Sequence, residues 1–345
     1  MAAPATARLP SYARWWWPPE MRILIAGLGS IGRRHLRNLQ ALGERDVLLY
    51  RTHRATLPEA DLDGLPVETD LEAALALKPD AVIVANPTSL HLEVALAAAR
   101  RGCALLIEKP VSHNFDHIDE LQNAVREGGG AVLVGFQFRF HPLLLRLREL
   151  LSAGTIGRPL FARAHWGEYL PGWHPWEDYR QGYSARADLG GGALLTLCHP
   201  LDYLAWTLGP LTCSAARLAT IGALGIDVDD YADLWLEGRD GLLGSVHLDY
   251  HARPASHGLE VGGERGTLRC DFTAGRLTLS PLGSGASLEE GPPPGFDRND
   301  LFVAEMEHFL RLTRGEETSK CGLEEGLASL RLVVEARQRA EEHSS

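Results

Sequence analysis

A glycine-rich turn near the start of the chain has the residue types needed to hold a dinucleotide. Three glycines in the pattern G-x-G-x-x-G separate an apolar run at 22–26 from a helical pattern at 31–42. The first glycine permits a tight turn, the second lets the backbone approach a pyrophosphate, and the third lets helix and strand pack closely. The alternative is a glycine-rich turn that holds no ligand. The predicted pyrophosphate contacts are Gly27, Gly29, Ser30, Ile31 and Gly32.

The end of the second apolar run, 47–50, should influence which nicotinamide cofactor binds. An NAD-selective site places an Asp or Glu here, about 20 residues beyond the glycines. This chain has no carboxylate at that end, whereas Arg51 and Arg54 could pair with a 2′-phosphate and Thr52 could hydrogen-bond to it. We therefore predict a preference for NADP over NAD. The alternative is that the two arginines form a solvated strand end.

Further motifs lie downstream of the glycine turn. The sequence E-K-P at 108–110 follows an apolar run, the segment 135–142 reads GFQFRFHP, and G-G-A at 191–193 precedes His199. In this combination the chain resembles the glucose–fructose oxidoreductase, inositol dehydrogenase and rhizopine catabolism (Gfo/Idh/MocA) family over residues 21–340. The resemblance implies a nicotinamide-dependent oxidoreductase that is a homodimer or homotetramer.

The resemblance implies that Lys109 and His199 serve the reacting carbinol. Oxidation of an alcohol needs a base for the hydroxyl proton as hydride leaves the carbon, and reduction needs the same group as an acid. A free lysine has a pKa of about 10.4, so it could act as a base only if that pKa were lowered, whereas a histidine titrates near neutrality. We therefore expect His199 to transfer the proton and Lys109 to polarise the substrate oxygen. The alternatives are a surface lysine and a capping or core histidine.

The chain departs from the family pattern just before His199. Family members often carry an Asp three or four residues earlier, where this sequence has Thr196 and Leu195. Thr196 can hydrogen-bond but supplies no charge, so either the proton relay is shorter or Asp202 substitutes. Asp202 lies three residues after His199 and could share its helix face. It could equally be a structural residue of that helix.

The carboxyl ends of the later parallel strands lie where doubly wound sheets bind ligands. Two segments stand at such ends, one after the run 81–85 and one after the run 104–107. We therefore expect additional cofactor contacts from Asn86, Pro87, His91, Glu108 and Lys109.

Aromatic residues are concentrated between 166 and 183, with six in 18 residues where the 7% average of the chain predicts about one. Such side chains can stack on the C–H faces of a sugar, and arginines nearby, Arg186 among them, could hold a carboxylate or phosphate. The alternative is that these aromatics form core or subunit contacts. The predicted substrate contacts are Arg139, Trp173, Tyr179, Arg180 and Tyr183.

The elements that position these residues fall into two domains. In 21–136, short apolar runs alternate with helical patterns, which predicts a Rossmann domain with a parallel sheet. In 137–345, alternating strand patterns joined by glycine turns predict an α+β domain with a large, mainly antiparallel sheet and helices on one side. The fold class is therefore α/β with a second α+β domain. Residues 1–20 are expected to be a disordered leader, with Met21 as the natural start.

Composition limits the partners and the location. The chain of 345 residues has 34 basic and 45 acidic side chains, a net charge of −11, which argues against nucleic acid. No run reaches about 18 apolar residues, so no membrane span is expected. Five cysteines without a C-x-x-C pair favour a reducing cytoplasm over a disulfide framework. His247 and His251 share a strand face without further ligands, so no metal is predicted.

These observations predict an NAD(P)-dependent oxidoreductase that acts on a secondary hydroxyl or keto group of a sugar, sugar acid or nucleotide sugar. One alternative is a net non-redox sugar reaction, such as glycoside cleavage through transient oxidation by a tightly bound cofactor. A second is a cofactor-binding regulator without turnover. Release of free NADPH would separate the first alternative from the main hypothesis, and an Lys109→Met variant without effect on function would support the second.

Overall fold

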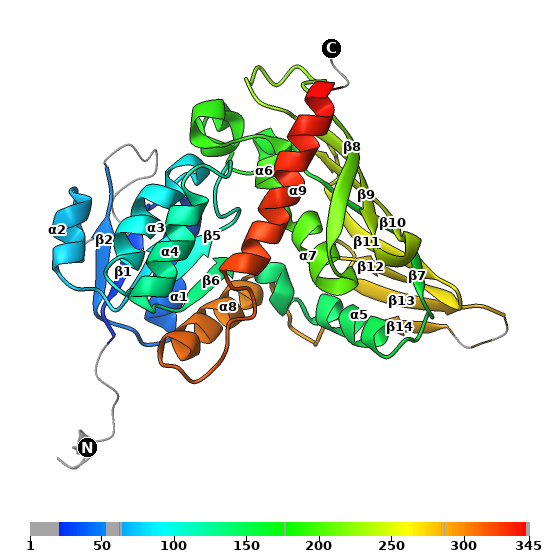
Figure 1. The fold of residues 1–345 in the computed structure, drawn as a ribbon, viewed down its shortest axis with the longest axis horizontal. Helices are drawn as coiled ribbons and strands as arrows, with labels where there is room; N and C mark the ends of the chain where they lie inside the picture. The colour runs from blue at the N-terminus through cyan, green and yellow to red at the C-terminus, as the bar shows by residue number, and fades with distance from the viewer. Residues whose placement is uncertain are drawn as a thin grey trace, which may run out of the picture.

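The computed structural model describes residues 21–52, 62, 64–175, 177–283, 285 and 287–342. Two β-sheets organise this part of the chain, one of six strands and one of eight (Figure 1). The expected leader at 1–20 and Arg54 lie outside the described residues. Among the described helices, none has the length and apolar character needed to cross a membrane.

The six-stranded sheet is parallel throughout and has the order β3-β2-β1-β4-β5-β6. The order reverses between β1 and β4, which is where doubly wound sheets bind ligands. Every residue of β1 and β4 is buried, because helices cover both faces of the sheet. The strands are β1 (Ile23–Ala26), β2 (Val47–Tyr50), β3 (Val67–Glu68), β4 (Ala81–Val84), β5 (Ala104–Glu108) and β6 (Val132–Gly135). The predicted Rossmann sheet is therefore confirmed.

Helices from both ends of the chain cover this sheet. Within the N-terminal half, α3 packs against α4, while α1 packs against α8 from the C-terminal segment. The N–H of Val134 in β6 also donates to the carbonyl of Cys321 at 2.8 Å. The helices are α1 (Ser30–Ala41), α2 (Leu71–Ala76), α3 (His91–Ala99), α4 (Ile118–Gly128) and α8 (Arg298–Thr313). The C-terminal residues thus complete the N-terminal sheet, and a domain boundary at residue 136 stays a prediction.

The eight-stranded sheet has the order β14-β13-β12-β11-β7-β10-β9-β8 and is antiparallel except where β7 meets β10. Its strands are β7 (Pro159–Gly167), β8 (Leu211–Ala219), β9 (Tyr231–Gly238), β10 (Leu243–Asp249), β11 (Ser256–Gly263), β12 (Gly266–Asp271), β13 (Arg276–Pro281) and β14 (Leu288–Glu290). The predicted mainly antiparallel sheet is confirmed, and β8 and β14 add to the strands expected from alternation.

Helices cover one face of this second sheet (Figure 1). α9 packs against β8 and α7, α7 packs against β7, and α5 packs against β12 and β13. These helices are α5 (Pro142–Ser152), α7 (His199–Leu208) and α9 (Leu323–Glu342), and the short α6 (Ala193–Thr196) directly precedes α7. The turn between β6 and α5 and the start of α7 therefore bring residues of the second half to the carboxyl end of β5.

Candidate active site

The glycine turn between β1 and α1 has the shape of an anion cradle. Gly27 has a φ of +96°, and a Cβ there would lie 2.4 Å from the backbone N of Asn86. A Cβ on Gly32 would lie 2.0 Å from the carbonyl oxygen of Gly27, so both positions require glycine. In contrast, a Cβ on Gly29 would meet no atom within 4 Å. Because α1 begins at Ser30 without a side-chain cap or an acidic first turn, its N–H groups face this open space.

The end of β2 presents less cationic surface than its sequence suggests. The Arg51 side chain is buried, with 7% of the residue exposed, and its backbone N–H donates to the Glu68 carbonyl at 3.1 Å. Thr52 is exposed. Residues 50–52 contain no carboxylate, as the sequence shows. Arg54, the second predicted partner of a 2′-phosphate, lies outside the described residues.

His91 joins the loops that follow β4 and β5. Its Nδ1 lies 2.9 Å from the Pro110 carbonyl oxygen and its Nε2 lies 2.9 Å from the Asn86 carbonyl oxygen. Burial lowers the pKa of this imidazole. Both ring nitrogens therefore face backbone oxygens, and the contact of His91 with the cofactor stays a prediction. Asn86 and the half-buried Pro87 remain candidates, since the buried Oδ1 of Asn86 has no hydrogen-bond partner among the described residues.

Glu108 is also directed into the protein. One of its carboxylate oxygens lies 2.8 Å from Nε2 of His35 in α1, and the other accepts the backbone N–H of Lys109 at 3.2 Å. Burial raises the pKa of Glu108, but the contacts with His35 and Lys109 together outweigh it and the net shift is downward. The Glu108 carboxylate therefore holds the backbone that carries Lys109, and a contact of Glu108 with the cofactor stays a prediction.

Glu305 of α8 lies beside this pair. Ligand-type atoms of His35, Glu108 and Glu305 lie within 4.8 Å of one another, and all three residues are buried. Burial, together with the charge of Glu108, raises the pKa of Glu305 well above its usual value. A neutral Glu305 beside an ionised Glu108 is the charge state that this burial favours.

Lys109 extends from the end of β5 toward the segment before α7. Its Nζ donates to the backbone carbonyl of Thr196 at 2.6 Å. Burial lowers the pKa of Lys109, but Tyr183, Cys198 and Glu108 raise it, and the net shift is upward. Lys109 is therefore an ammonium ion at neutral pH, which suits it to donate a hydrogen bond. Thr196 contributes its carbonyl to Lys109, whereas its side chain lies beside Tyr250.

His199 is the first residue of α7 and is enclosed by aromatic rings. The residue is 2% exposed, and its ring lies 5.2 Å from the stacked ring of Trp166, 5.1 Å from Phe138 and 5.6 Å from Phe136. Its buried Nδ1 has no hydrogen-bond partner among the described residues. Burial, and then the positive charge of Lys109, lowers its pKa well below the usual value. The expectation that His199 titrates near neutrality is thus wrong, because its environment is apolar and cationic.

Asp202 and Arg139 form a hydrogen-bonded ion pair with each other. Nη2 of Arg139 lies 2.7 Å from one Asp202 oxygen and Nε lies 3.0 Å from the other, while Nη1 donates to the Lys320 carbonyl at 2.6 Å. Both side chains are buried. The expectations that Asp202 supports His199 and that Arg139 holds substrate are both corrected. The guanidinium directs its donors to these partners, and the carboxylate is engaged with the guanidinium.

The aromatic segment before α6 lies only partly open to a ligand. The Tyr179 hydroxyl donates to the Leu224 carbonyl at 2.7 Å, and Arg180 pairs with Asp178 at 2.9 Å. The Trp173 ring packs edge-on against Tyr250 at 5.5 Å, and its buried Nε1 has no partner among the described residues. Tyr183 is 37% exposed. Tyr183 and Trp173 therefore stay candidates for substrate contact, whereas the polar groups of Tyr179 and Arg180 are engaged.

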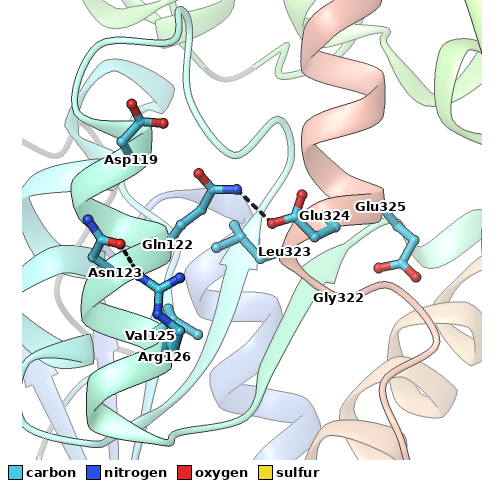
Figure 2. A pocket seen from close by; sticks show the side chains of 9 residues that line it. All are labelled: Asp119, Gln122, Asn123, Val125, Arg126, Gly322, Leu323, Glu324 and Glu325. Atoms are coloured by element: carbon cyan, nitrogen blue, oxygen red, sulfur yellow. Dashed lines mark hydrogen bonds between the residues drawn. The ribbon is translucent and has the colours of Figure 1, made fainter.

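A separate hollow of about 760 Å³ lies between α4 and the start of α9 (Figure 2). Its lining contains none of the predicted site residues, and its polar groups contact one another: the Gln122 amide donates to Glu324 at 2.7 Å, and Arg126 bonds to Asn123. Acidic side chains, Asp119, Glu324 and Glu325, predominate there. This hollow contains neither the glycine turn nor Lys109 or His199.

The fold and this arrangement define a two-domain dinucleotide-binding protein with a charged lysine and a buried histidine at the strand ends. Residues 21–136 match the family model described as "Oxidoreductase family, NAD-binding Rossmann fold", and residues 144–269 match the "GFO/IDH/MocA C-terminal domain". The chain belongs to the GFO/IDH/MocA family of oxidoreductases.

Known proteins of this type are similar over different parts of the chain. A 1,5-anhydro-D-fructose reductase from Ensifer adhaerens is 30% identical over 59% of this chain and 60% of its own length. The chain therefore spans less than two thirds of that relative. An inositol 2-dehydrogenase from Saccharopolyspora erythraea is 30% identical over 71% of this chain and 70% of its own. The structure of a levoglucosan dehydrogenase with NADH and levoglucosan superposes with a TM-score of 0.80 at 18% identity, covering 93% of this chain and 97% of that one.

Proposed function

We propose that this protein is an NAD(P)-dependent oxidoreductase that transfers hydride between a nicotinamide and a secondary hydroxyl or keto group of a sugar, sugar acid or nucleotide sugar. The observation that carries the proposal is the position of Lys109 at the carboxyl end of β5, where its Nζ contacts the Thr196 carbonyl three residues before the buried His199. The glycine cradle lies at the same edge of the sheet.

The residues divide the chemistry between them. A bound nicotinamide supplies the hydride acceptor for oxidation and the donor for reduction. Lys109 donates a hydrogen bond to the substrate oxygen and stabilises the negative charge that develops on it. His199, neutral before the reaction, accepts the hydroxyl proton during oxidation and returns it during reduction. The rings of Phe136, Phe138 and Trp166 exclude water from the imidazole, which strengthens these electrostatic interactions.

The names of the relatives support a redox reaction on a sugar or polyol. They include an anhydrofructose reductase, an inositol dehydrogenase and a levoglucosan dehydrogenase. These names favour the main hypothesis over a non-redox reaction or a silent regulator. The test is the absorbance of reduced nicotinamide during turnover of a panel of sugars, sugar acids and nucleotide sugars. Stoichiometric formation of free NADH or NADPH during oxidation, or its stoichiometric consumption during reduction, supports the proposal, and product formation without either change contradicts it.

The cofactor preference rests on the end of β2. The absence of a carboxylate at residues 50–52 supports NADP, while the NADH bound by the levoglucosan dehydrogenase supports NAD in relatives. We propose that the protein accepts both and prefers NADP. Comparison of kcat/KM for NADH and NADPH tests this, and a clear preference for NADH would contradict it.

The outer face of the eight-stranded sheet supports self-association. On the face away from the helices, Trp235 is 51% exposed and Leu243 is 61% exposed. They border a hollow of about 460 Å³ over β8, β9 and β10. We propose that a second copy covers this face in a homodimer or homotetramer. Light scattering after size-exclusion chromatography tests this, and a monomer at micromolar concentration would contradict it.

A further inference from the structure

The proposed site contains a cation, Lys109, that has no carboxylate partner among the described residues. The groups that raise the pKa of Lys109 are Tyr183, Cys198 and Glu108. Burial raises the pKa of the Cys198 thiol to about 11, so this group is neutral at neutral pH. Glu108 is engaged by His35 at 2.8 Å. What Lys109 contacts directly is the uncharged carbonyl of Thr196.

The other carboxylate near His199 is also engaged. Asp202 pairs with Arg139 inside the protein. The position where family members often carry an aspartate is occupied by Thr196 or Leu195. The described part of the site therefore has no ionised carboxylate directed at Lys109 Nζ.

A second cation lies at the same site. Arg298 is the first residue of α8 and is exposed, and its side chain forms no hydrogen bond or ion pair with the described residues. Its neighbours on both sides are fixed. The Phe296 ring lies 5.3 Å from His141, and the Asn299 amide donates to Asn38 of α1 at 3.0 Å.

These two contacts place Arg298 between the aromatic rings around His199 and the helix that begins at the glycine turn. His141 lies 5.7 Å from Phe138, which lies 5.1 Å from His199. The electrostatics agree with this placement: burial is the main cause of the lowered pKa of His199 and His257, and the charge of Arg298 lowers both further. Burial and then the charge of Arg298 also act to lower the pKa of Lys109, against its net upward shift, so the two cations act on the same site.

The sequence suggested other arginines as partners for a carboxylate or phosphate of the substrate, but these form ion pairs within the protein. Arg139 pairs with Asp202, Arg180 pairs with Asp178, and Arg186 pairs with Asp188. Within the described parts of the chain, the Arg298 side chain has no such partner.

Resting on the proposed function, we infer that the substrate carries an anionic group, a carboxylate or a phosphate, which Arg298 and Lys109 bind beside the reacting carbinol. The substrate then supplies the negative charge that an aspartate before His199 would have supplied. A guanidinium can bind either anion through two parallel hydrogen bonds, and Lys109 adds a point charge. Of the two anions, a carboxylate on the sugar ring fits best, because it has the charge and shape of the aspartate side chain that Thr196 or Leu195 replaces in this chain.

The first experiment compares matched pairs that differ in one charge. Binding to the NADH-loaded protein and initial rates with NAD and NADP are measured for D-glucuronate against D-glucose, and for D-galacturonate against D-galactose. Glucose 6-phosphate serves as the phosphate arm. Because a hydrogen bond to a charged group contributes about 1.5–3 kcal/mol, the acid should be preferred by about 10- to 150-fold, and added NaCl should reduce that preference. Equal affinity for acid and neutral sugar would overturn the inference. A preference for glucose 6-phosphate over both sugars would support an anionic substrate but would show that its anionic group is a phosphate and not a carboxylate.

The second experiment removes the charge of Arg298. Arg298→Gln should reduce the preference for the acid by about tenfold or more while the neutral sugar changes by less than about twofold, and Arg298→Lys should retain part of the preference. Arg100→Gln, which removes an exposed arginine far from the site, is the matched control and should change neither. An equal loss on acid and neutral sugar in Arg298→Gln would show a structural role and overturn the inference.

The outcomes also separate this inference from the proposed function. If neutral sugars are turned over with NAD or NADP and acids are not preferred, the proposed function stands and the inference fails. If NADH binds but no sugar of either charge is turned over, the proposed function fails and the inference fails with it.

Discussion

Two cations lie close to the segment that leads into α7, and they differ in their partners. Arg139 directs its guanidinium to Asp202 and to the Lys320 carbonyl. Lys109 reaches only the carbonyl of Thr196 and forms no ion pair with the described residues. A buried ion pair that is complete within the protein fixes the packing of the segments that carry it. A cation without a counter-ion keeps its charge for a ligand, so the fold distinguishes groups that hold the structure from groups that remain open.

The largest effect is expected on stability, when the ion pair between Arg139 and Asp202 is broken. Asp202→Ala leaves the Arg139 charge buried and unpaired, so the free energy of unfolding should fall by about 3–5 kcal/mol. Urea unfolding followed by circular dichroism measures this change. The double variant Arg139→Met with Asp202→Leu is the control and should recover most of the loss. If the single variant is as stable as the parent protein, the structural role of the pair is refuted.

Substitution of Lys109, which forms no ion pair with the described residues, should affect turnover instead of stability. Lys109→Met should reduce kcat by about 100- to 1000-fold, because a preorganised donor to the substrate oxygen is lost. Cofactor binding and the thermal midpoint should change little. Lys78→Met, at an exposed lysine distant from the site, controls for loss of one charge. If the Lys109→Met variant unfolds or keeps full activity, the conclusion that Lys109 serves turnover while Arg139 serves stability is contradicted.

The same contrast applies within the glycine turn. A Cβ at position 29 meets open space, so Gly29→Ala should fold normally but weaken binding of NADH by about tenfold or more, since the methyl group occupies the pyrophosphate side of the turn. A Cβ at position 32 would collide with the Gly27 carbonyl, so Gly32→Ala should lower stability as well. Fluorescence titration with NADH and thermal melting measure the two effects. Unaltered binding in Gly29→Ala would argue against a pyrophosphate at this turn.

The smallest effect concerns a buried histidine that holds structure. Burial lowers the pKa of His141 to about 4, and its Nδ1 accepts the Leu143 N–H at 3.2 Å at the start of α5. The unfolded chain binds the proton more tightly, so this histidine stabilises the fold above about pH 6.5 and the stabilisation is lost as the pH falls toward 4. Between pH 7.5 and pH 5.5 the loss expected from this one histidine is about 1 kcal/mol, measured by urea unfolding as the difference between the parent protein and the His141→Asn variant. His141→Asn keeps an acceptor without the titration and should show a weaker pH dependence.

The cofactor half of the site could be predicted from sequence because it is local. The glycines act through contacts with the first strand, the first helix and the residues after β4, and the G-x-G-x-x-G pattern specifies that geometry almost by itself. The parallel sheet followed from apolar runs that are buried on both faces. The expected antiparallel sheet followed from alternation, whereas β14 has only three residues and no clear alternation to detect.

The polar environment of the site could not be predicted in this way. Asp202 lies three residues from His199 in sequence, yet it pairs with Arg139, which is 63 residues away. The lowered pKa of His199 depends on rings from β7 and from the turn after β6. Arg298 reaches the site because α8 returns to α1. Such partners depend on tertiary packing, and a single sequence has no local signal for them.

The return of the chain to its first domain has a consequence for biosynthesis. The packing of α8 on α1 and the bond from Val134 to Cys321 come only from residues near the C-terminus. During translation, the nascent cofactor-binding half therefore emerges with part of its apolar surface uncovered, and it stays so until the last helices leave the ribosome. A ribosome-stalled chain ending near residue 290 should bind chaperones, and release of the complete chain should end that binding.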